Sequence, residues 1–377
     1  MSKTLQDYAT LINDTIQSNE INHYITTDNM CQNLGGIDAF KNINIPQGKV
    51  RSFKKDDILL SNIRLYFRKV YRAKQKGGCS SDVLVFRAKH IDSATLFAIL
   101  SSQIFTDYAC SGSQGSKMPR GNKTHMMNFK IPTINFTIAK IFNSIQNKIE
   151  NNHKINELLH KILELLYEQY FVRFDFSDEN NKPYQTSGGK MKFSKELNRL
   201  IPNGWSVRFL NHKIVSTYQP KTISKTLLNN SYSYSVYGGG GIIGRFTEYN
   251  HEQSEFIISC RGQCGISYLT LPKSWITGNA MVIRPTKSYT SKTYLYHTIK
   301  KYKLTNYITG SVQPQITRQN LSTMPILIPK RKILNKWNNI SSLLWNLIHN
   351  NMQSTQTLTA LRDFLLPLLL KQQVKPQ

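Results

Sequence analysis

Apolar and polar residues form the same series of patterns twice along the chain. Each series contains two short apolar runs typical of buried strands, then a helical pattern, a Gly-Ser loop, an Ile-Pro pair and a long segment with helical spacing. The first apolar run, 57–61, reads Asp-Ile-Leu-Leu-Ser, and its counterpart 198 residues later, 255–259, reads Glu-Phe-Ile-Ile-Ser. Because the blocks recur in one order at nearly one offset, we predict a duplicated fold.

The other paired blocks keep the same order. They are the runs 81–87 and 278–284, the helical patterns 94–108 and 293–308, and the pairs Ile131-Pro132 and Ile328-Pro329. Strands and helices mixed in this way predict an α/β (α+β) fold in each copy.

The two long segments, 136–171 and 333–371, carry a heptad-like pattern. Its positions in the first segment are Ile138, Ile141, Ile145, Lys148, Asn152, Ile155, Leu159, Ile162 and Leu166. In the second they are Trp337, Ile340, Leu344, Leu347, Asn351, Ser354, Leu358, Leu361, Leu365 and Leu368. We predict two helices, each about 50 Å long, that pair as an antiparallel coiled coil. Ordinary amphipathic core helices remain the alternative.

Asn152 and Asn351 occupy matching positions near the middle of these helices. In an antiparallel pair the midpoints meet, so the two asparagines are predicted to face each other and to fix the register, as a core asparagine does in coiled coils. Two solvated asparagines on the helix flanks are the alternative.

The net charge of the chain indicates what kind of partner it binds. The 377 residues include 49 Lys and Arg against 22 Asp and Glu, a formal net charge of +27. Residues 1–200 hold 28 basic and 18 acidic side chains, and residues 201–377 hold 21 and 4. Such an excess favours a polyanionic partner, most simply a nucleic acid.

The sequence shows no pattern of a membrane span, a signal peptide or a cysteine pair. No apolar stretch reaches the roughly 18 to 20 residues of a membrane span, and the first residues lack the pattern of a signal peptide, so we expect a cytoplasmic protein with no membrane partner. The five cysteines form no CxxC pair and are expected to be reduced thiols.

Catalytic and metal-binding motifs are also missing. The glycine run 238–241 lacks the Lys-Ser/Thr ending of a phosphate-binding loop, no Asn/Asp-Pro-Pro-Tyr methyltransferase motif occurs, and the nine histidines show no metal-ligand spacing. We therefore predict no catalytic residue, no metal site and no bound cofactor. A methyltransferase or nuclease with a divergent site stays open as an alternative.

The segment from Arg64 to Lys76 has the clearest basic pattern. Read by twos, it predicts a strand with a cationic face and an apolar back. Its candidate DNA contacts are Arg64, Arg68, Lys69, Arg72 and Lys74.

Two loops at equivalent places in the copies supply further candidates. The first contains Lys117, Arg120 and Lys123, and its counterpart contains Gln313, Gln315 and Arg318. Gln and Arg side chains can bind adenine and guanine edges in the major groove. The glycine turn of the second copy and its surroundings add Tyr237, Gly239, Gly240, Arg245, Arg261 and Gln263.

With these residues in view, the chain resembles the specificity subunit of type I restriction-modification systems. The resemblance rests on the duplicated layout, on Tyr-Gly-Gly-x-Gly-Ile at 237–242, on the blocks 256–265 and 275–284, and on Pro-Asn-Gly-Trp at 202–205. It covers essentially the whole chain, although no Pro-x-Gly-Trp motif precedes the first copy.

The resemblance implies two globular target recognition domains, separated by two long antiparallel helices, in a molecule with pseudo-two-fold symmetry. It places the first recognition domain at 1–135, the first spacer helix at 136–174, a linker at 175–200, the second recognition domain at 201–332 and the second spacer helix at 333–371. Each domain is then expected to read one half of a bipartite site in double-stranded DNA.

The resemblance also implies the partners. Two methyltransferase (modification) subunits would bind this subunit, and a restriction subunit would join through them. S-adenosylmethionine, ATP and magnesium would act on those partner subunits, so this chain would contribute no catalysis. A non-specific nucleic-acid-binding protein is the remaining alternative, and it gives the duplication no obvious use.

Overall fold

A computed structural model describes residues 3–38, 41, 43–131, 134–229, 232–262, 264–310 and 313–369. Pro132, Gln263 and Ser311, which belong to predicted motifs, lie outside this part. The chain divides into two compact units, which we call unit 1 (1–155 and 351–377) and unit 2 (156–350). Each unit contains an α/β domain and a part of both long helices.

Unit 1 is built on a four-stranded antiparallel sheet. Its order is β1 (Ala9–Ile12), β8 (Val83–Ala88), β5 (Ile58–Ser61) and β6 (Val70–Arg72). A second sheet contains β2 (Thr15–Gln17), β4 (Lys49–Phe53), β7 (Gly77–Cys79) and β3 (Tyr24–Ile25). The short helices are α1 (Leu5–Tyr8), α2 (Ser93–Leu100), α3 (Gln103–Ser111) and α4 (Lys123–Met127). Buried apolar residues of α2, β5 and β8 form one core with residues of both long helices, among them Phe142 and Leu366.

Unit 2 repeats the main sheet in the same order. It contains β12 (Val215–Tyr218), β18 (Ala280–Pro285), β15 (Phe256–Ser259) and β16 (Ser267–Leu269). The strand registers correspond as well, because Leu59 pairs with Val85 in unit 1 and Ile257 with Val282 in unit 2. These pairs lie at the predicted repeat offset, so the duplication is confirmed in the sheet.

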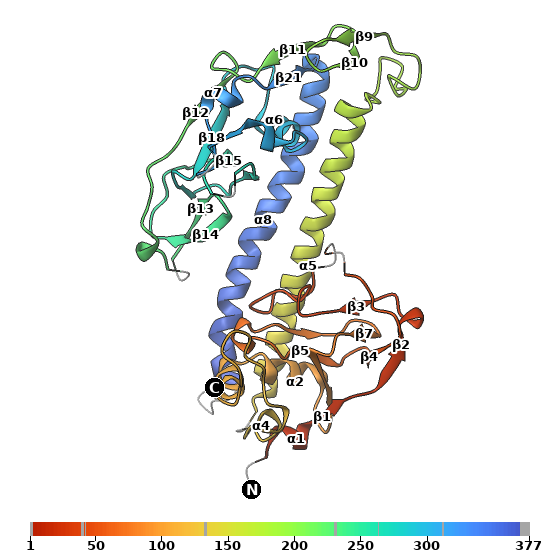
Figure 1. Cartoon of the computed structure of the whole chain (residues 1–377), viewed down its shortest axis with the longest axis vertical. Helices are drawn as coiled ribbons and strands as arrows, with labels where there is room; N and C mark the ends of the chain where they lie inside the picture. Colours follow the sequence, from red (N-terminus) through yellow and green to blue (C-terminus); the bar gives the residue numbers. More distant parts are fainter. Residues whose placement is uncertain are drawn as a thin grey trace. The chain divides into compact units, whose positions relative to one another are not determined.

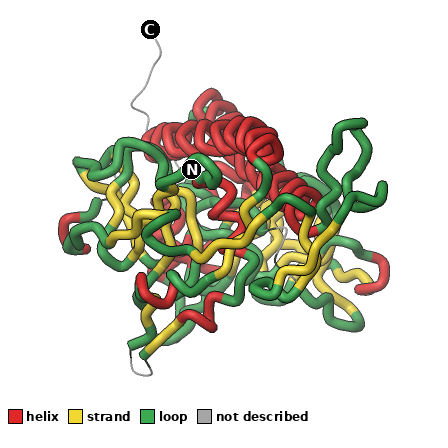
Figure 2. Tube along the Cα trace, turned by 90° about the horizontal axis from the view of Figure 1, so that it is seen from above, coloured by secondary structure: helices red, strands yellow, loops and turns green. Residues whose placement is uncertain are grey.

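The remaining elements of unit 2 surround this sheet. A second sheet consists of β14 (Gly241–Phe246), β13 (Tyr234–Gly238) and β17 (Trp275–Ile276). Three strand pairs are β9 (Met191–Ser194) with β10 (Arg199–Pro202), β11 (Ser206–Phe209) with β21 (Pro325–Ile328), and β19 (Ile308–Thr309) with β20 (Gln315–Ile316). The short helices are α6 (Lys292–Lys300) and α7 (Arg318–Leu321). Long loops join many of the strands, as Figure 2 shows.

The two long helices are α5 (Phe136–Tyr167) and α8 (Arg331–Leu369), which run side by side in each unit (Figure 1). In unit 1, Gln146 of α5 accepts a hydrogen bond from Arg362 of α8 at 3.1 Å. In unit 2, the ring of Tyr167 lies edge-on to that of Trp337, with centroids 5.8 Å apart. Since the early part of α5 meets the late part of α8 and the reverse, the predicted antiparallel pairing is confirmed.

The buried face of α5 differs from the predicted one at every second position. This buried face, which we call the contact ladder, contains Phe142, Ile145, Ile149, Asn152 and Leu163, which are at most 7% exposed. Ile141, Ile155 and Ile162 were predicted in the ladder, but each is 44% exposed. The predicted and the buried positions share Ile145 and Asn152. The packing within each unit buries the set that also contains Phe142 and Ile149, and it leaves the predicted Ile141 and Ile155 exposed.

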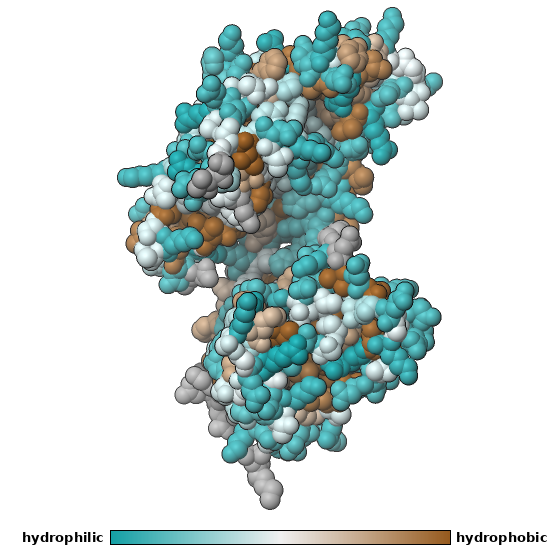
Figure 3. Space-filling view, in the orientation of Figure 1, coloured by the Kyte–Doolittle hydropathy of each residue, from teal (hydrophilic) through white to brown (hydrophobic). Residues whose placement is uncertain are grey.

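Hydrophilic side chains cover most of the face shown in Figure 3, and hydrophobic side chains form separate small groups. None of the described helices is both long enough and apolar enough to cross a membrane.

Candidate nucleic-acid interface

The basic segment that begins at Arg64 does not form the predicted strand. Leu65–Phe67 is a short 3-10 turn, and only Val70–Arg72 is a strand, β6. Arg64 and Arg68 flank the turn with φ values of 51° and 49°, in the left-handed region. An extended chain cannot contain such residues, so the two-residue alternation of charge does not place the cations on one face.

Most cations of this segment bind groups of unit 1 itself. Arg68 donates to the carbonyl oxygen of Ser101 at 2.9 Å, and Lys69 donates to that of Thr27. Burial lowers the pKa of both Arg68 and Lys69. The predicted cationic face is therefore wrong in its geometry, because these side chains are turned into the unit.

Arg72 and Lys74 connect the domain to helix α5. The Arg72 guanidinium donates to Asp56 at 2.8 Å and to Asn143 at 2.8 Å. Lys74 donates to Asn147 at 2.7 Å and lies 3.3 Å from the carboxylate of Glu150. These contacts give both side chains a structural role within unit 1.

Arg64 instead joins the second predicted element, the loop that contains Lys117, Arg120 and Lys123. Its backbone N–H donates to the Pro119 carbonyl at 2.9 Å, and its guanidinium reaches the Lys117 carbonyl at 3.4 Å. Lys117 and Lys123 are exposed, and the Arg120 side chain is 62% exposed. Unit 1 thus presents a compact cationic loop to solvent.

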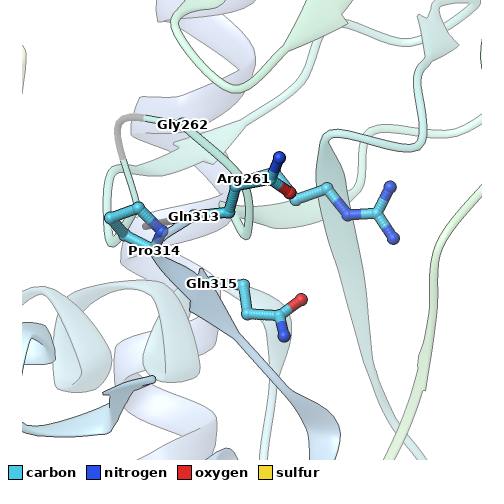
Figure 4. Close-up of a pocket in the computed structure, with 5 residues that line it drawn as sticks. All are labelled: Arg261, Gly262, Gln313, Pro314 and Gln315. Carbon is cyan, nitrogen blue, oxygen red and sulfur yellow. The ribbon is translucent and has the colours of Figure 1, made fainter. Parts of the chain in front are cut away.

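Unit 2 brings most of its candidates together around one surface hollow. The hollow is lined by Arg261, Gly262, Gln313, Pro314 and Gln315. Arg261 and Gln315 are paired by an antiparallel bridge, and the three long polar side chains extend to the same side of their loops (Figure 4). This arrangement presents one guanidinium and two amides, which are groups that can bind base edges.

The glycine turn lies beside this hollow. A Cβ on Gly239 would meet the Arg261 carbonyl oxygen at 3.0 Å, so a larger residue would press on the loop that carries Arg261. Gly240 is exposed and nothing lies within 4 Å of a Cβ placed there. Arg318 is exposed at the start of α7. The structure therefore brings Gly239, Gly240 and Arg261 to the loop that carries the two amides.

Two candidates of unit 2 lie elsewhere. Tyr237 is only 3% exposed, and its hydroxyl accepts a hydrogen bond from the Leu271 N–H at 3.0 Å. Burial raises the pKa of Tyr237 to about 12, so it belongs to the core and not to a binding surface. Arg245 donates to the carbonyl oxygens of Tyr232 and Ser233, which ties down the loop before β13. The structure thus places neither residue at the hollow, and Gln263 lies outside the described residues.

The asparagine at the middle of α5 does pair with α8, although with another partner. The Asn152 amide is 1% exposed and donates to the Thr355 hydroxyl at 3.1 Å. Thr355 lies about one helical turn beyond Asn351, the predicted partner. A buried polar contact between the helices is thus present, and Thr355 supplies the oxygen.

Sequence reasoning missed the residue that holds Arg120. Asp82 lies 3.0 Å from the Arg120 guanidinium, although 38 positions separate them in the sequence. An acid at the start of a strand carries no recognisable signal, so only the fold shows this contact. Among the described residues, no group of three or more His, Cys, Asp or Glu is placed to hold a metal ion.

Comparison with known proteins shows what the chain resembles. Residues 202–361 match the family model described as the Type I restriction modification DNA specificity domain. The MjaIX specificity subunit of a type I restriction enzyme from Methanocaldococcus jannaschii is 21% identical over an alignment of 311 residues, and the match covers 73% of this chain and 67% of that protein.

A solved structure shows the same fold. The S subunit of a type I restriction-modification system from M. genitalium matches with a TM-score of 0.64 at 14% identity, over 99% of this chain and 96% of that one. The HsdS subunit from Thermoanaerobacter tengcongensis matches with a TM-score of 0.36 at 15% identity, over 99% and 97% of the two chains. Residues 202–361 therefore belong to the Type I restriction modification DNA specificity domain family, and the chain as a whole resembles type I restriction-modification specificity subunits in sequence and in fold.

Proposed function

We propose that this chain is the DNA-recognition subunit of a type I restriction-modification complex, and that each unit reads one half of a bipartite target in double-stranded DNA. One observation carries the proposal. Both units place a loop of long polar side chains at the same point of the repeated fold, but the side chains differ between the copies. Two similar sites of different chemistry suit two half-sites of different sequence.

The charge of these loops supports DNA as the ligand. Arg64, Lys117, Arg120 and Lys123 gather in unit 1, and Arg261 and Arg318 lie at the corresponding loops of unit 2. Lys and Arg that neutralise phosphates release counterions, which drives binding and makes it depend on salt. Gln313 and Gln315 supply donors and acceptors that match the adenine edge.

Chemistry on the DNA is assigned to other subunits. Methyl transfer from S-adenosylmethionine and cleavage that requires ATP and magnesium would take place on the methyltransferase and restriction subunits. The role of this chain is to position them on the target, and it contributes no catalytic residue.

The outer face of the long helices is the surface proposed to bind the methyltransferase subunits. In unit 2 its exposed apolar residues are Leu158, Ile162 and Leu165 of α5 and Ile340, Leu343 and Leu347 of α8. Three of them precede a buried residue of their own helix by one position, because Ile162 precedes Leu163, Ile340 precedes Ser341 and Leu347 precedes Ile348. Each step along a helix turns by about 100°, and the helices run in opposite directions, so both sets lie on one face of the pair.

The α/β domain of unit 2 covers the other face. Lys300 of α6 binds Glu164 at 2.5 Å, and Lys301 lies 3.2 Å from Glu168. Glu164 and Glu168 follow the buried residues Leu163 and Tyr167 by one position, whereas Ile162 precedes Leu163. Ile348 of α8 is 1% exposed and belongs to the buried face of that helix, not to its outer face.

Unit 1 has a smaller set of the same kind. Ile141 and Ile155 of α5 and Leu361 and Phe364 of α8 are 44% to 67% exposed. An apolar helix face in each unit agrees with two methyltransferase subunits bound to one specificity subunit.

The proposal is tested by mapping adenine methylation across the genome of cells that contain the methyltransferase, with and without this chain. The proposal predicts methylation of one two-part motif, present only with this chain. Unchanged methylation in its absence would reject the proposed function, and methylation without a defined motif would favour a non-specific nucleic-acid-binding protein.

A further inference from the structure

One position of the duplicated fold is occupied by Arg120 in unit 1 and by Gln315 in unit 2. In unit 1, Arg120 forms a bridge with Ile63, and the next residue, Gly121, donates to the Asn62 carbonyl at 3.1 Å. In unit 2, Gln315 forms a bridge with Arg261, and Ile316 donates to the Cys260 carbonyl at 3.0 Å. The two loops therefore attach to the ends of β5 and β15 in the same way.

The surroundings of this position correspond residue by residue. A proline precedes it in each copy, Pro119 and Pro314. Arg120 pairs with Gln114, and Gln315 pairs with Thr309, six residues earlier in both cases. Two residues after it stands the residue that caps the next short helix, Asn122 in unit 1 and Thr317 in unit 2. The backbone around Arg120 and Gln315 is thus the same, and the side chain is the variable.

The copies agree in charge where contact with a phosphate is expected. The residue after the cap is Lys123 in unit 1 and Arg318 in unit 2, and both are exposed cations. Phosphate contacts carry no sequence information, so two domains that bind different half-sites can use the same charge there. Base contacts must differ between the half-sites, as Arg120 and Gln315 do.

A second residue changes together with this position. Asp82 lies 3.0 Å from the Arg120 guanidinium, and its carbonyl accepts the Asn62 N–H at 2.7 Å. The same backbone bond in unit 2 joins the Cys260 N–H to the Asn279 carbonyl at 3.0 Å. An acid therefore accompanies the arginine in unit 1, and Asn279 holds the equivalent backbone position in unit 2.

We propose, resting on the function proposed above, that Arg120 reads a guanine in the first half-site and that Gln315 reads an adenine at the equivalent point of the second. A guanidinium donates to O6 and N7 of guanine, whereas a glutamine amide both donates to N7 and accepts from N6 of adenine. Asp82 is a positioning residue, because it holds one edge of the Arg120 guanidinium and leaves other donors directed to the base. The class of base read in each half thus follows from one side chain in each copy.

The test uses the full chain in complex with its methyltransferase subunits and selects binding sites from duplexes with randomised sequence. Arg120→Gln is expected to change one position of the first half-site from guanine to adenine. Gln315→Arg combined with Asn279→Asp is expected to change one position of the second half-site from adenine to guanine. In each variant the other half-site keeps its sequence, and the preference at the changed position shifts on the order of tenfold to a hundredfold.

Three further variants sharpen the result. Arg120→Lys keeps the charge without the two-pronged geometry and is expected to lose the guanine preference without gaining an adenine preference. Asp82→Asn is expected to weaken the preference at that position alone, which a purely structural contact would not do. Lys49→Gln, at an exposed position on β4, is the matched control that keeps the selected sequence.

Two failures can be told apart. If the wild-type complex selects no defined two-part sequence, the proposed function itself is wrong. If the wild-type complex selects such a sequence, while Arg120→Gln and the double variant keep their melting temperatures and select the same sequence, the assignment of Arg120 and Gln315 is overturned.

Discussion

The Asp57 carboxylate accepts two hydrogen bonds from the Arg87 guanidinium, at 2.8 Å from Nε and 2.7 Å from Nη2. Unit 2 repeats this contact between Glu255 and Arg284, at 3.0 and 2.7 Å. In both pairs the acid precedes an inner strand of the main sheet and is buried, and the arginine is the next-to-last residue of the neighbouring strand. The ion pair fixes the same two strands in both copies and is part of the duplicated fold.

Removal of the acid is expected to destabilise unit 1. Asp57→Asn leaves the Arg87 guanidinium without its charged partner, and because Arg87 is a third exposed, water compensates in part. We expect a loss of about 1–3 kcal/mol in the free energy of unfolding, measured by urea denaturation followed by circular dichroism. Asp28→Asn, at an exposed position, is the matched control. Equal stability of the two variants would contradict a structural role of the pair.

Arg72 is expected to contribute to stability and not to DNA affinity. Arg72→Gln removes the bonds to Asp56 and Asn143, and the Arg72 side chain is 21% exposed. We expect a loss of about 1–2 kcal/mol in stability, with little change in affinity for the target duplex. Fluorescence anisotropy with labelled DNA measures the affinity. A large drop in affinity at unchanged stability would restore Arg72 as a DNA contact.

Lys123 and Arg318 are expected to bind phosphates. Replacement of either by Gln lowers affinity for every sequence and reduces the slope of log K against log salt by about one for each phosphate that is no longer neutralised. Titrations at several salt concentrations measure that slope, with target and random duplexes compared. A change in the selected bases, with the slope unchanged, would show that these cations read sequence instead.

Unit 2 is expected to lose stability in acid because of two buried histidines. Burial lowers the pKa of His297 to about 3 and that of His349 to about 4, whereas a histidine in the unfolded chain has its ordinary pKa near 6.5. Between these values the unfolded state binds more protons, so stability falls as the pH drops below about 6.5.

All four tryptophans lie in unit 2, so tryptophan fluorescence reports the unfolding of this unit. His349→Gln is expected to reduce the stability difference between pH 7.5 and pH 5 by about 1–2 kcal/mol. If the stability difference between the two pH values is the same as in the wild type, folding does not lower the pKa of His349.

The apolar face of the long helices is expected to bind the methyltransferase. Leu165→Asp and Leu343→Asp place charges on this face at positions that are 58% and 61% exposed, so unit 2 should still fold. Both variants should fail to co-purify with the methyltransferase. Leu227→Asp, at another exposed apolar position of unit 2, is the control that keeps the partner. Normal co-purification of both helix variants would reject this surface.

Repetition made the fold predictable. The order of the sequence blocks and their constant offset predicted the duplicated domains and the paired helices, because the same pattern of apolar residues occurs in both copies. The contact ladder of α5 was predicted only in part, since Ile141 and Ile155 are as apolar as Ile149 and tertiary packing decides between them.

The site was predictable where it follows the repeat. Arg120, Lys123, Gln315 and Arg318 lie in matched loops, and the structure exposes all of them. The alternation of charge after Arg64 was misleading, because nothing in a sequence announces that Arg64 and Arg68 adopt left-handed backbone angles. The Asp82 contact depends on chain segments that only the fold brings together.

The most direct test of the central claim is selection of duplexes by the wild-type complex from a fully randomised pool. The two copies of one recognition loop, with different side chains, predict a target of two short defined sequences separated by a gap of fixed length without sequence preference. A single continuous sequence, or no sequence at all, would contradict the claim that each unit reads one half of the site.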